Sequence, residues 1–219
     1  MSRRFIVVLA ALVWLGAATT AKAGPILFEW AVNQDGVVSS SPLPANWNDA
    51  AFDFASGLGT LAVTITGPGT HGVFLFLDIE IDEETNTFFN EVGTISGTPA
   101  ADQSWEIDEP GFVSGDIYEN FLNGALDNSV GTTNPDDVSV ALGWNFVLAA
   151  GQSALVTFHV TDVMPQGGFY LVQTDPDSPA SIYFASNLIV RDETIPEPAT
   201  LLLLGTGLLM LGARVKPRR

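Results

Sequence analysis

Hydrophobic and polar residues alternate along several long segments of the chain, which predicts β-strands with one buried face. The alternation is clearest at residues 61–66, 73–82, 138–148 and 156–161. Shorter apolar segments predict further strands at residues 26–32, 169–173, 182–184 and 188–190. Turn-forming residues separate the segments, as at Gly67-Pro68-Gly69 and Gln166-Gly167-Gly168.

Two connections give more specific expectations. Residues 149–152 join two strong strand segments with few residues, so we expect a β-hairpin there. Between residues 116 and 128, apolar residues stand at near-helical spacing, which favours a short helix or an ordered loop: Ile117, Phe121, Leu122 and Leu126. Many strands with short turns, and no alternation of strands with helices, predict an all-β fold. We expect a two-sheet antiparallel sandwich or jelly roll.

The N-terminus has the three-part pattern of a secretory signal peptide. Arg3 and Arg4 form a positive region, residues 5–18 carry no charge, and Ala21-Lys22-Ala23 places small residues where signal peptidase reads them. The predicted cleavage lies between Ala23 and Gly24. An uncleaved anchor is the alternative, but the apolar stretch is shorter than the roughly 20 residues of a spanning helix.

The C-terminus combines three features in a fixed order. Pro196-Glu197-Pro198 is stiff, because each proline fixes its own φ and biases the residue before it away from helix. An apolar segment of about 15 residues follows, at the short edge of what spans a bilayer. A basic cluster then closes the chain: Arg214, Lys216, Arg218 and Arg219. Such a segment should stop in the membrane with its charges on the cytoplasmic side.

This tail resembles the PEP-CTERM sorting domain of Gram-negative bacteria over residues 195–219. Pro196, Glu197 and Pro198 correspond to the signature tripeptide, followed by the transmembrane stretch and the basic cluster. The resemblance implies that an exosortase, a membrane-embedded cysteine transpeptidase-like enzyme, recognises the tail and cleaves near the tripeptide. It also implies an association with exopolysaccharide and biofilm. A plain tail anchor is the alternative.

We therefore expect three regions: a signal peptide at residues 1–23, an acidic β-sandwich domain at 24–194 and the sorting tail at 195–219. The central domain has about 170 residues, enough for one core. The chain has no cysteine, which excludes disulfides, thiolate zinc sites, cysteine nucleophiles and a bacterial lipoprotein anchor.

Charge is distributed very unevenly. All 25 acidic residues lie between Glu29 and Glu197, whereas Arg191 is the only basic residue in that range, so its formal charge is about −24. This charge argues against nucleic acid and anionic lipid surfaces as partners. The negative charge has two explanations. It suits hard divalent cations, which take carboxylate ligands, or it serves only to keep an extracellular domain soluble.

The strongest acidic constellation is Asp78, Glu80 and Asp82. These residues occupy alternate positions on one predicted strand, so their side chains project from one face about 7 Å apart. A calcium ion would relieve their mutual repulsion, although a solvated face explains the same pattern. Two turns offer further oxygen clusters, Asp175-Pro176-Asp177-Ser178 and Asn134-Pro135-Asp136-Asp137, although each alone is more typical of an Asx turn.

No catalytic constellation is apparent, so we expect no enzymatic activity. His71 and His159 have no second histidine nearby at ligand spacing. Phe74 and Phe76 lie opposite the apolar set of their strand, where they fill a second layer or form part of a ligand platform. Trp47 and Trp105 lie near expected loops, where aromatic rings suit sugar stacking.

The sequence is compatible with two functions. The first is a non-enzymatic envelope or extracellular-matrix protein, processed by signal peptidase and exosortase and associated with exopolysaccharide. The second is a calcium-dependent glycan-binding module on the same sorting tail. Both expect an exported protein with an inner-membrane intermediate, no certain cofactor and at most a bound Ca²⁺.

Overall fold

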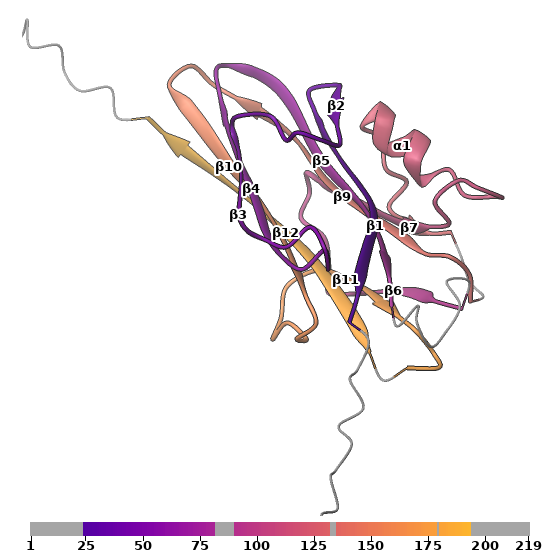
Figure 1. Cartoon of the computed structure of the whole chain (residues 1–219). Coiled ribbons are helices and arrows are strands. Elements are labelled where there is room, and N and C mark those ends of the chain that lie inside the picture. Colours follow the sequence, from indigo (N-terminus) through magenta and orange to yellow (C-terminus); the bar gives the residue numbers. More distant parts are fainter. Residues whose placement is uncertain (1–23, 82–89, 132–134, 179, 194–219) are drawn as a thin grey trace, which may run out of the picture.

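The computed structural model describes residues 24–81, 90–131, 135–178 and 180–193 (Figure 1). The strands form two six-stranded sheets. The order in sheet A is β2 (Val37–Ser39), β1 (Ile26–Gln34), β5 (Gly69–Glu80), β9 (Ser139–Leu148), β7 (Gln103–Asp108) and β8 (Ser129–Val130). The order in sheet B is β3 (Trp47–Phe52), β4 (Gly59–Thr66), β10 (Gln152–Thr161), β12 (Ser181–Asp192), β11 (Tyr170–Thr174) and β6 (Val92–Ser96).

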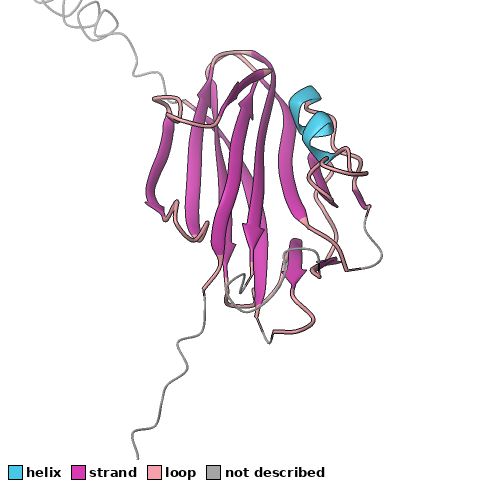
Figure 2. Cartoon of the chain, turned by 45° about the vertical axis from the view of Figure 1, so that its right-hand side comes forward, coloured by secondary structure: helices cyan, strands magenta, loops and turns pink. Residues whose placement is uncertain are grey.

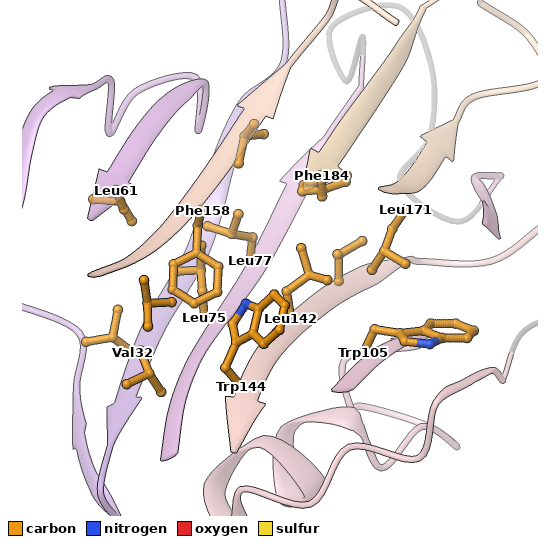
Figure 3. Packing of buried hydrophobic residues seen from close by; sticks show 14 of the residues in the cluster. Val32, Leu61, Leu75, Leu77, Trp105, Leu142, Trp144, Phe158, Leu171 and Phe184 are labelled. Carbon is orange, nitrogen blue, oxygen red and sulfur yellow. The ribbon is translucent and has the colours of Figure 1, made fainter. Parts of the chain in front are cut away.

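Neighbouring strands are antiparallel, with the exception of the short parallel pair β7 and β8. The main core lies between the sheets, where inward-facing residues of both interdigitate (Figure 3). Leu75 and Leu142 of sheet A face Phe158 and Phe184 of sheet B in this layer. The predicted two-sheet antiparallel sandwich is therefore confirmed.

Strand β5 is buried on both faces. Its residues Leu75 and Leu77 belong to the main core, whereas Phe74 and Phe76 point to the outer face of sheet A. The helix α1 (Ile117–Asn123) covers that outer face and contributes Phe121 to a second apolar cluster (Figure 2). Of the two expectations for residues 116–128, the short helix is confirmed.

The expected hairpin at residues 149–152 is wrong. The turn itself forms, and the Gln152 backbone N–H donates to the Ala149 carbonyl over 3.1 Å. However, β9 before it pairs with β5 and β7 in sheet A, while β10 after it pairs with β4 and β12 in sheet B. The turn thus carries the chain from one sheet to the other. Residues 67–68, between β4 and β5, make the same change of sheet.

A hairpin does form where the sequence pattern predicts only one strand, at residues 26–32. β1 and β2 are joined through Asp35 and Gly36, which both have positive φ (53° and 81°). This conformation matches the right-handed twist of the paired strands, and glycine adopts it without steric cost. The segments 182–184 and 188–190, predicted as separate strands, are parts of the single long strand β12.

Candidate functional site

Most residues of the predicted sorting signals lie outside the described part of the chain. This applies to Ala21 and Ala23 at the N-terminus, to Pro196, Glu197 and Pro198, and to Arg214, Lys216, Arg218 and Arg219. Gly24, the predicted first residue of the mature chain, is described and exposed, two residues before β1 begins. Within the described ranges no helix has the length and apolar character needed to cross a membrane.

A compact group of carboxylates lies at one end of sheet A. Asp78 and Glu80 come from the end of β5, and Asp137 lies two residues before β9 begins. One carboxylate oxygen from each of the three lies within 4.8 Å of the others. Because β5 and β9 are paired with Asp78 opposite Ser139, their register brings this group together. We call Asp78, Glu80 and Asp137 the β5–β9 acidic cluster.

This cluster is buried, which corrects the interpretation of these acids as a solvated face. The exposed fractions are 1% for Asp78, 5% for Glu80 and 9% for Asp137. Asp82, the third member of the predicted set, lies outside the described residues. Asp137 was singled out in the sequence only as part of a separate turn cluster, because nothing local shows that β9 pairs with β5.

Two carboxylates of the cluster, those of Asp78 and Asp137, are harder to ionise than ordinary aspartates. Burial raises the pKa of Asp78 to about 7, and the charges of Asp137, Glu29 and Glu109 add to this effect. Burial likewise raises the pKa of Asp137 to about 6, together with the charges of Glu109 and Asp136. Near neutral pH Asp78 therefore keeps much of its protonated form unless positive charge lies close to it.

Several oxygen atoms in and beside the cluster are buried without a hydrogen-bond partner: both carboxylate oxygens of Asp78, Oδ1 of Asp137 and the hydroxyl of Ser139. The Ser139 hydroxyl lies close enough to Asp78 to favour its ionised form slightly, although the geometry between them is not that of a hydrogen bond. Buried polar atoms are normally paired, so this concentration of unpaired oxygens is unusual.

Next to the cluster, Glu91 occupies a well-paired buried position. Its carboxylate accepts hydrogen bonds from the Ile81 backbone N–H and from the side-chain amide of Gln173. The same Gln173 amide donates to the Ile79 carbonyl oxygen, so it ties β11 of sheet B to β5 of sheet A. Burial raises the pKa of Glu91 to about 9, against the effect of these two donors.

Glu106, Asp108 and Asp116 form a second group, in which one carboxylate oxygen from each also lies within 4.8 Å of the others. This group differs from the first in its hydrogen bonding. Glu106 accepts from the Asn120 side chain and the Asp127 backbone N–H, and Asp108 accepts from the backbone N–H groups of Glu109 and Asp116. These acids connect the loop and α1 to β7. The carboxylates of Glu106 and Asp108 already have protein donors, so we assign no ion to this group.

Glu109 orders the loop between β7 and α1. Its carboxylate accepts hydrogen bonds from the backbone N–H groups of Gly111, Phe112, Val113, Ser114 and Gly115. Burial acts to raise the pKa of Glu109, but these donors outweigh it and leave the pKa below its ordinary value. This role is not evident from the sequence, since nothing in the local pattern distinguishes Glu109 from the other acids.

The two histidines lie far from the cluster in the strand register. His71 Nδ1 lies 3.0 Å from Asp35 Oδ2, and Nε2 lies 3.1 Å from the Gly67 carbonyl oxygen, so the ring ties two turns together. His159 faces outward on β10, where Nδ1 lies 3.0 Å from the Thr60 hydroxyl. Within the described residues neither ring belongs to a group of metal-ligating side chains.

The aromatic residues proposed for ligand stacking are buried. Trp47 stacks on Phe158 in the main core, and Trp105 packs against Phe169. Phe74 and Phe76 lie beneath α1, so they fill a second layer and the ligand-platform alternative is wrong for them. Among the described aromatic residues with large exposure are Phe28 on β1 and Phe112 in the loop held by Glu109.

Comparison with known proteins identifies the tail. Residues 194–219 match the PEP-CTERM protein-sorting motif. The chain is therefore an exported protein with a C-terminal signal that directs processing at the membrane. In particular, it is a PEP-CTERM sorting domain-containing protein, and the motif marks it as a target of exosortase. The sandwich lies outside the matched residues, and no curated protein and no solved structure matched the chain.

Proposed function

We propose that this chain is a non-enzymatic protein of the cell envelope or extracellular matrix, in which exosortase releases or transfers an acidic β-sandwich that associates with exopolysaccharide. Signal peptidase removes residues 1–23 during export, and the tail holds the protein in the inner membrane until exosortase acts. The association with exopolysaccharide and biofilm rests on the resemblance of the tail to its family.

The position of the last strand carries this proposal. β12 ends at Asp192, and the sorting motif is matched from residue 194 onward. Cleavage near Pro196, Glu197 and Pro198 would therefore leave every described strand of both sheets in the released product. This junction supports the view that the sandwich is the released product and that the tail is a removable sorting signal. So short a junction would keep the sandwich close to the membrane before processing.

The arrangement of polar groups supports a non-enzymatic role. In acyl-transfer sites the base is usually a histidine. A carboxylate orients its ring, and the ring takes a proton from the nucleophile. His71 contacts Asp35 but uses its other nitrogen on a backbone carbonyl. His159 contacts Thr60, and no carboxylate is hydrogen-bonded to its ring among the described residues. Neither His71 nor His159 therefore combines an orienting carboxylate on one ring nitrogen with a nucleophile on the other.

The sorting proposal is tested by replacing Pro196, Glu197 and Pro198 with alanine. Export should continue, because the signal peptide is unchanged, but the uncleaved form should accumulate in the membrane fraction. Immunoblots of membrane, surface and medium fractions measure this, with Thr200→Ala as a control outside the tripeptide. Normal cleavage and location of the triple variant would contradict the proposal. Deletion of the gene should also reduce the polysaccharide matrix if the association is correct.

One observation favours calcium-dependent glycan binding as a second candidate. Phe112 is 68% exposed in the loop that Glu109 holds, and the Glu109 charge acts on both Asp78 and Asp137. An exposed ring on an ordered loop beside acidic residues suits stacking on a sugar. Glycan-array binding that is lost with a chelator and in Phe112→Ala, but kept in Phe28→Ala, would establish this function. Chelator-resistant or absent binding would exclude it.

A further inference from the structure

We infer that Asp78, Glu80, Asp137 and the hydroxyl of Ser139 form a buried binding site for one calcium ion at the end of the β5–β9 strand pair. This inference does not depend on the sorting tail or on the proposed association with polysaccharide. It rests on the described residues of the sandwich alone.

The first argument is the unpaired state of the Asp78 carboxylate. Asp78 is 1% exposed, and neither of its oxygens has a hydrogen-bond partner. Oδ1 of Asp137 and the Ser139 hydroxyl, in the same place, are unpaired as well. A buried carboxylate without donors is strongly destabilising unless something compensates it. A cation in contact with these oxygens would satisfy all of them at once.

The second argument is the lack of a protein counter-charge. Among the described residues Arg191 is the only arginine or lysine. Arg191 pairs with Ser153, which also pairs with Thr66 just before the turn into β5. Asp78 lies nine positions along β5 from Gly69, about 30 Å from that turn at the usual rise of a strand. No described arginine or lysine therefore lies beside the cluster, and a bound cation would supply the missing positive charge.

The third argument concerns which ion fits. The site offers only oxygen atoms: three carboxylates within 4.8 Å of one another and one hydroxyl. Calcium takes six to eight oxygen ligands in irregular arrangements, including carboxylates bound through both oxygens, whereas magnesium demands a near-ideal octahedron. Histidine and cysteine, which favour zinc, are absent from the cluster. Calcium is therefore the best match.

The ion would also have a structural effect. Asp78 and Glu80 belong to β5, whereas Asp137 belongs to the segment that enters β9. Asp136 in that segment forms an isolated bridge with Glu91, with N···O distances of 2.9 Å in both directions. A calcium ion shared between Asp78 and Asp137 would hold this segment against the sheet and so stabilise one end of the sandwich.

Calcium binding can be measured on the full-length protein, purified in detergent and treated with a chelator. Equilibrium dialysis with radioactive calcium should find one ion per chain. Calcium at a hundredfold excess over its Kd should raise the Tm by about 5–10 °C. Sodium chloride at the same ionic strength should raise it much less, because it only screens the charges. Magnesium should likewise raise the Tm less than calcium does.

Two variants separate a bound ion from a general charge effect. Asp78→Asn with Asp137→Asn should abolish calcium binding and the calcium-dependent rise in Tm, while the calcium-free protein stays folded because repulsion is removed. Asp49→Asn with Asp162→Asn removes two exposed charges instead and should keep the full response. The inference is overturned if the first variant retains the calcium response, if both variants lose it equally, or if calcium and sodium chloride act alike on the wild type.

Discussion

The side-chain amide of Asn33 in β1 donates a 2.8 Å hydrogen bond to the carbonyl oxygen of Phe121 in α1, across 88 residues of sequence. The same amide donates to the Leu122 carbonyl over 3.0 Å. These carbonyls belong to the last turn of the helix, where backbone acceptors lack the regular donor four residues on, although the Phe121 carbonyl also accepts from the Gly124 N–H over 3.1 Å. Asn33 is 1% exposed, so it fixes α1 on sheet A from below.

We expect Asn33→Ala to lower the free energy of unfolding by about 1–3 kcal/mol, because two helix carbonyls lose a buried donor. Amide hydrogens of α1 should then exchange faster than those of the central strands. Urea unfolding and hydrogen exchange measure these effects. Asn46→Ala removes an exposed amide with two hydrogen bonds and serves as the control, with a change within about 0.5 kcal/mol. Equal effects of the two variants would contradict the assigned role.

Gly143 on β9 leaves the space that the Phe74 ring occupies. A Cβ atom at this position would overlap the Phe74 side chain, which is itself held beneath α1. We expect Gly143→Ala to lower the free energy of unfolding by about 1–3 kcal/mol through overpacking. Gly167→Ala is the matched control, since a Cβ there meets no atom within 4 Å. Denaturant unfolding of both variants tests the prediction, and an unchanged stability for Gly143→Ala would refute it.

Glu106 makes stability depend on pH. Burial raises its pKa to about 7 from an ordinary 4.5, with the charges of Asp127 and Asp116 adding to the effect against donors on Asp127 and Asn120. The folded state therefore holds the proton more tightly than the unfolded state. The resulting stabilisation is complete below the ordinary pKa and is lost as pH rises through about 7.

Accordingly, Glu106→Gln should show a smaller loss of stability than the wild type between pH 5 and pH 8, since glutamine does not titrate. Urea unfolding across this range, with chelator present throughout, gives the comparison. Glu119→Gln changes an exposed acid on α1 and should retain the wild-type slope. A slope that is the same in all three proteins would show that Glu106 is ionised in the folded state.

The mature chain should begin at Gly24, because Ala21 and Ala23 present small side chains to signal peptidase. N-terminal sequencing of the protein from membrane and surface fractions tests this. Ala23→Leu should block cleavage at this bond and leave a longer chain, whereas Lys22→Ala should not. Detection of Met1 or Phe5 at the N-terminus of the wild-type mature protein would contradict the predicted cleavage.

The sequence predicts the main core well because its strands alternate with period two. Leu61, Val63 and Ile65 on β4 and Val156, Phe158 and Val160 on β10 all face the core as their spacing requires. The second apolar cluster, between sheet A and α1, is less evident from the sequence. The uninterrupted apolar run from Val73 to Leu77 is typical of a strand buried on both faces, but no local pattern shows that α1 supplies the cover.

The candidate site could be predicted only in part. Asp78 and Glu80 share a strand face by their spacing, as the sequence indicates. Asp137 joins them only because β9 pairs with β5, a non-local pairing that no turn or periodicity encodes. The incorrect hairpin at residues 149–152 has the same origin. Turn residues determine that the chain reverses, but not which sheet receives the next strand.

The position of β12 has a mechanical consequence. This strand leads into the sorting tail, and it lies inside sheet B with β10 and β11 on its two sides. In the proposed anchored form, a pull on Asp192 directed along β12 would load the whole ladder from Gln152–Asp192 to Thr161–Tyr183 in shear rather than opening one pair at a time. In the membrane-anchored form that we propose, the sandwich would therefore bear tension from the tail with many hydrogen bonds sharing the force.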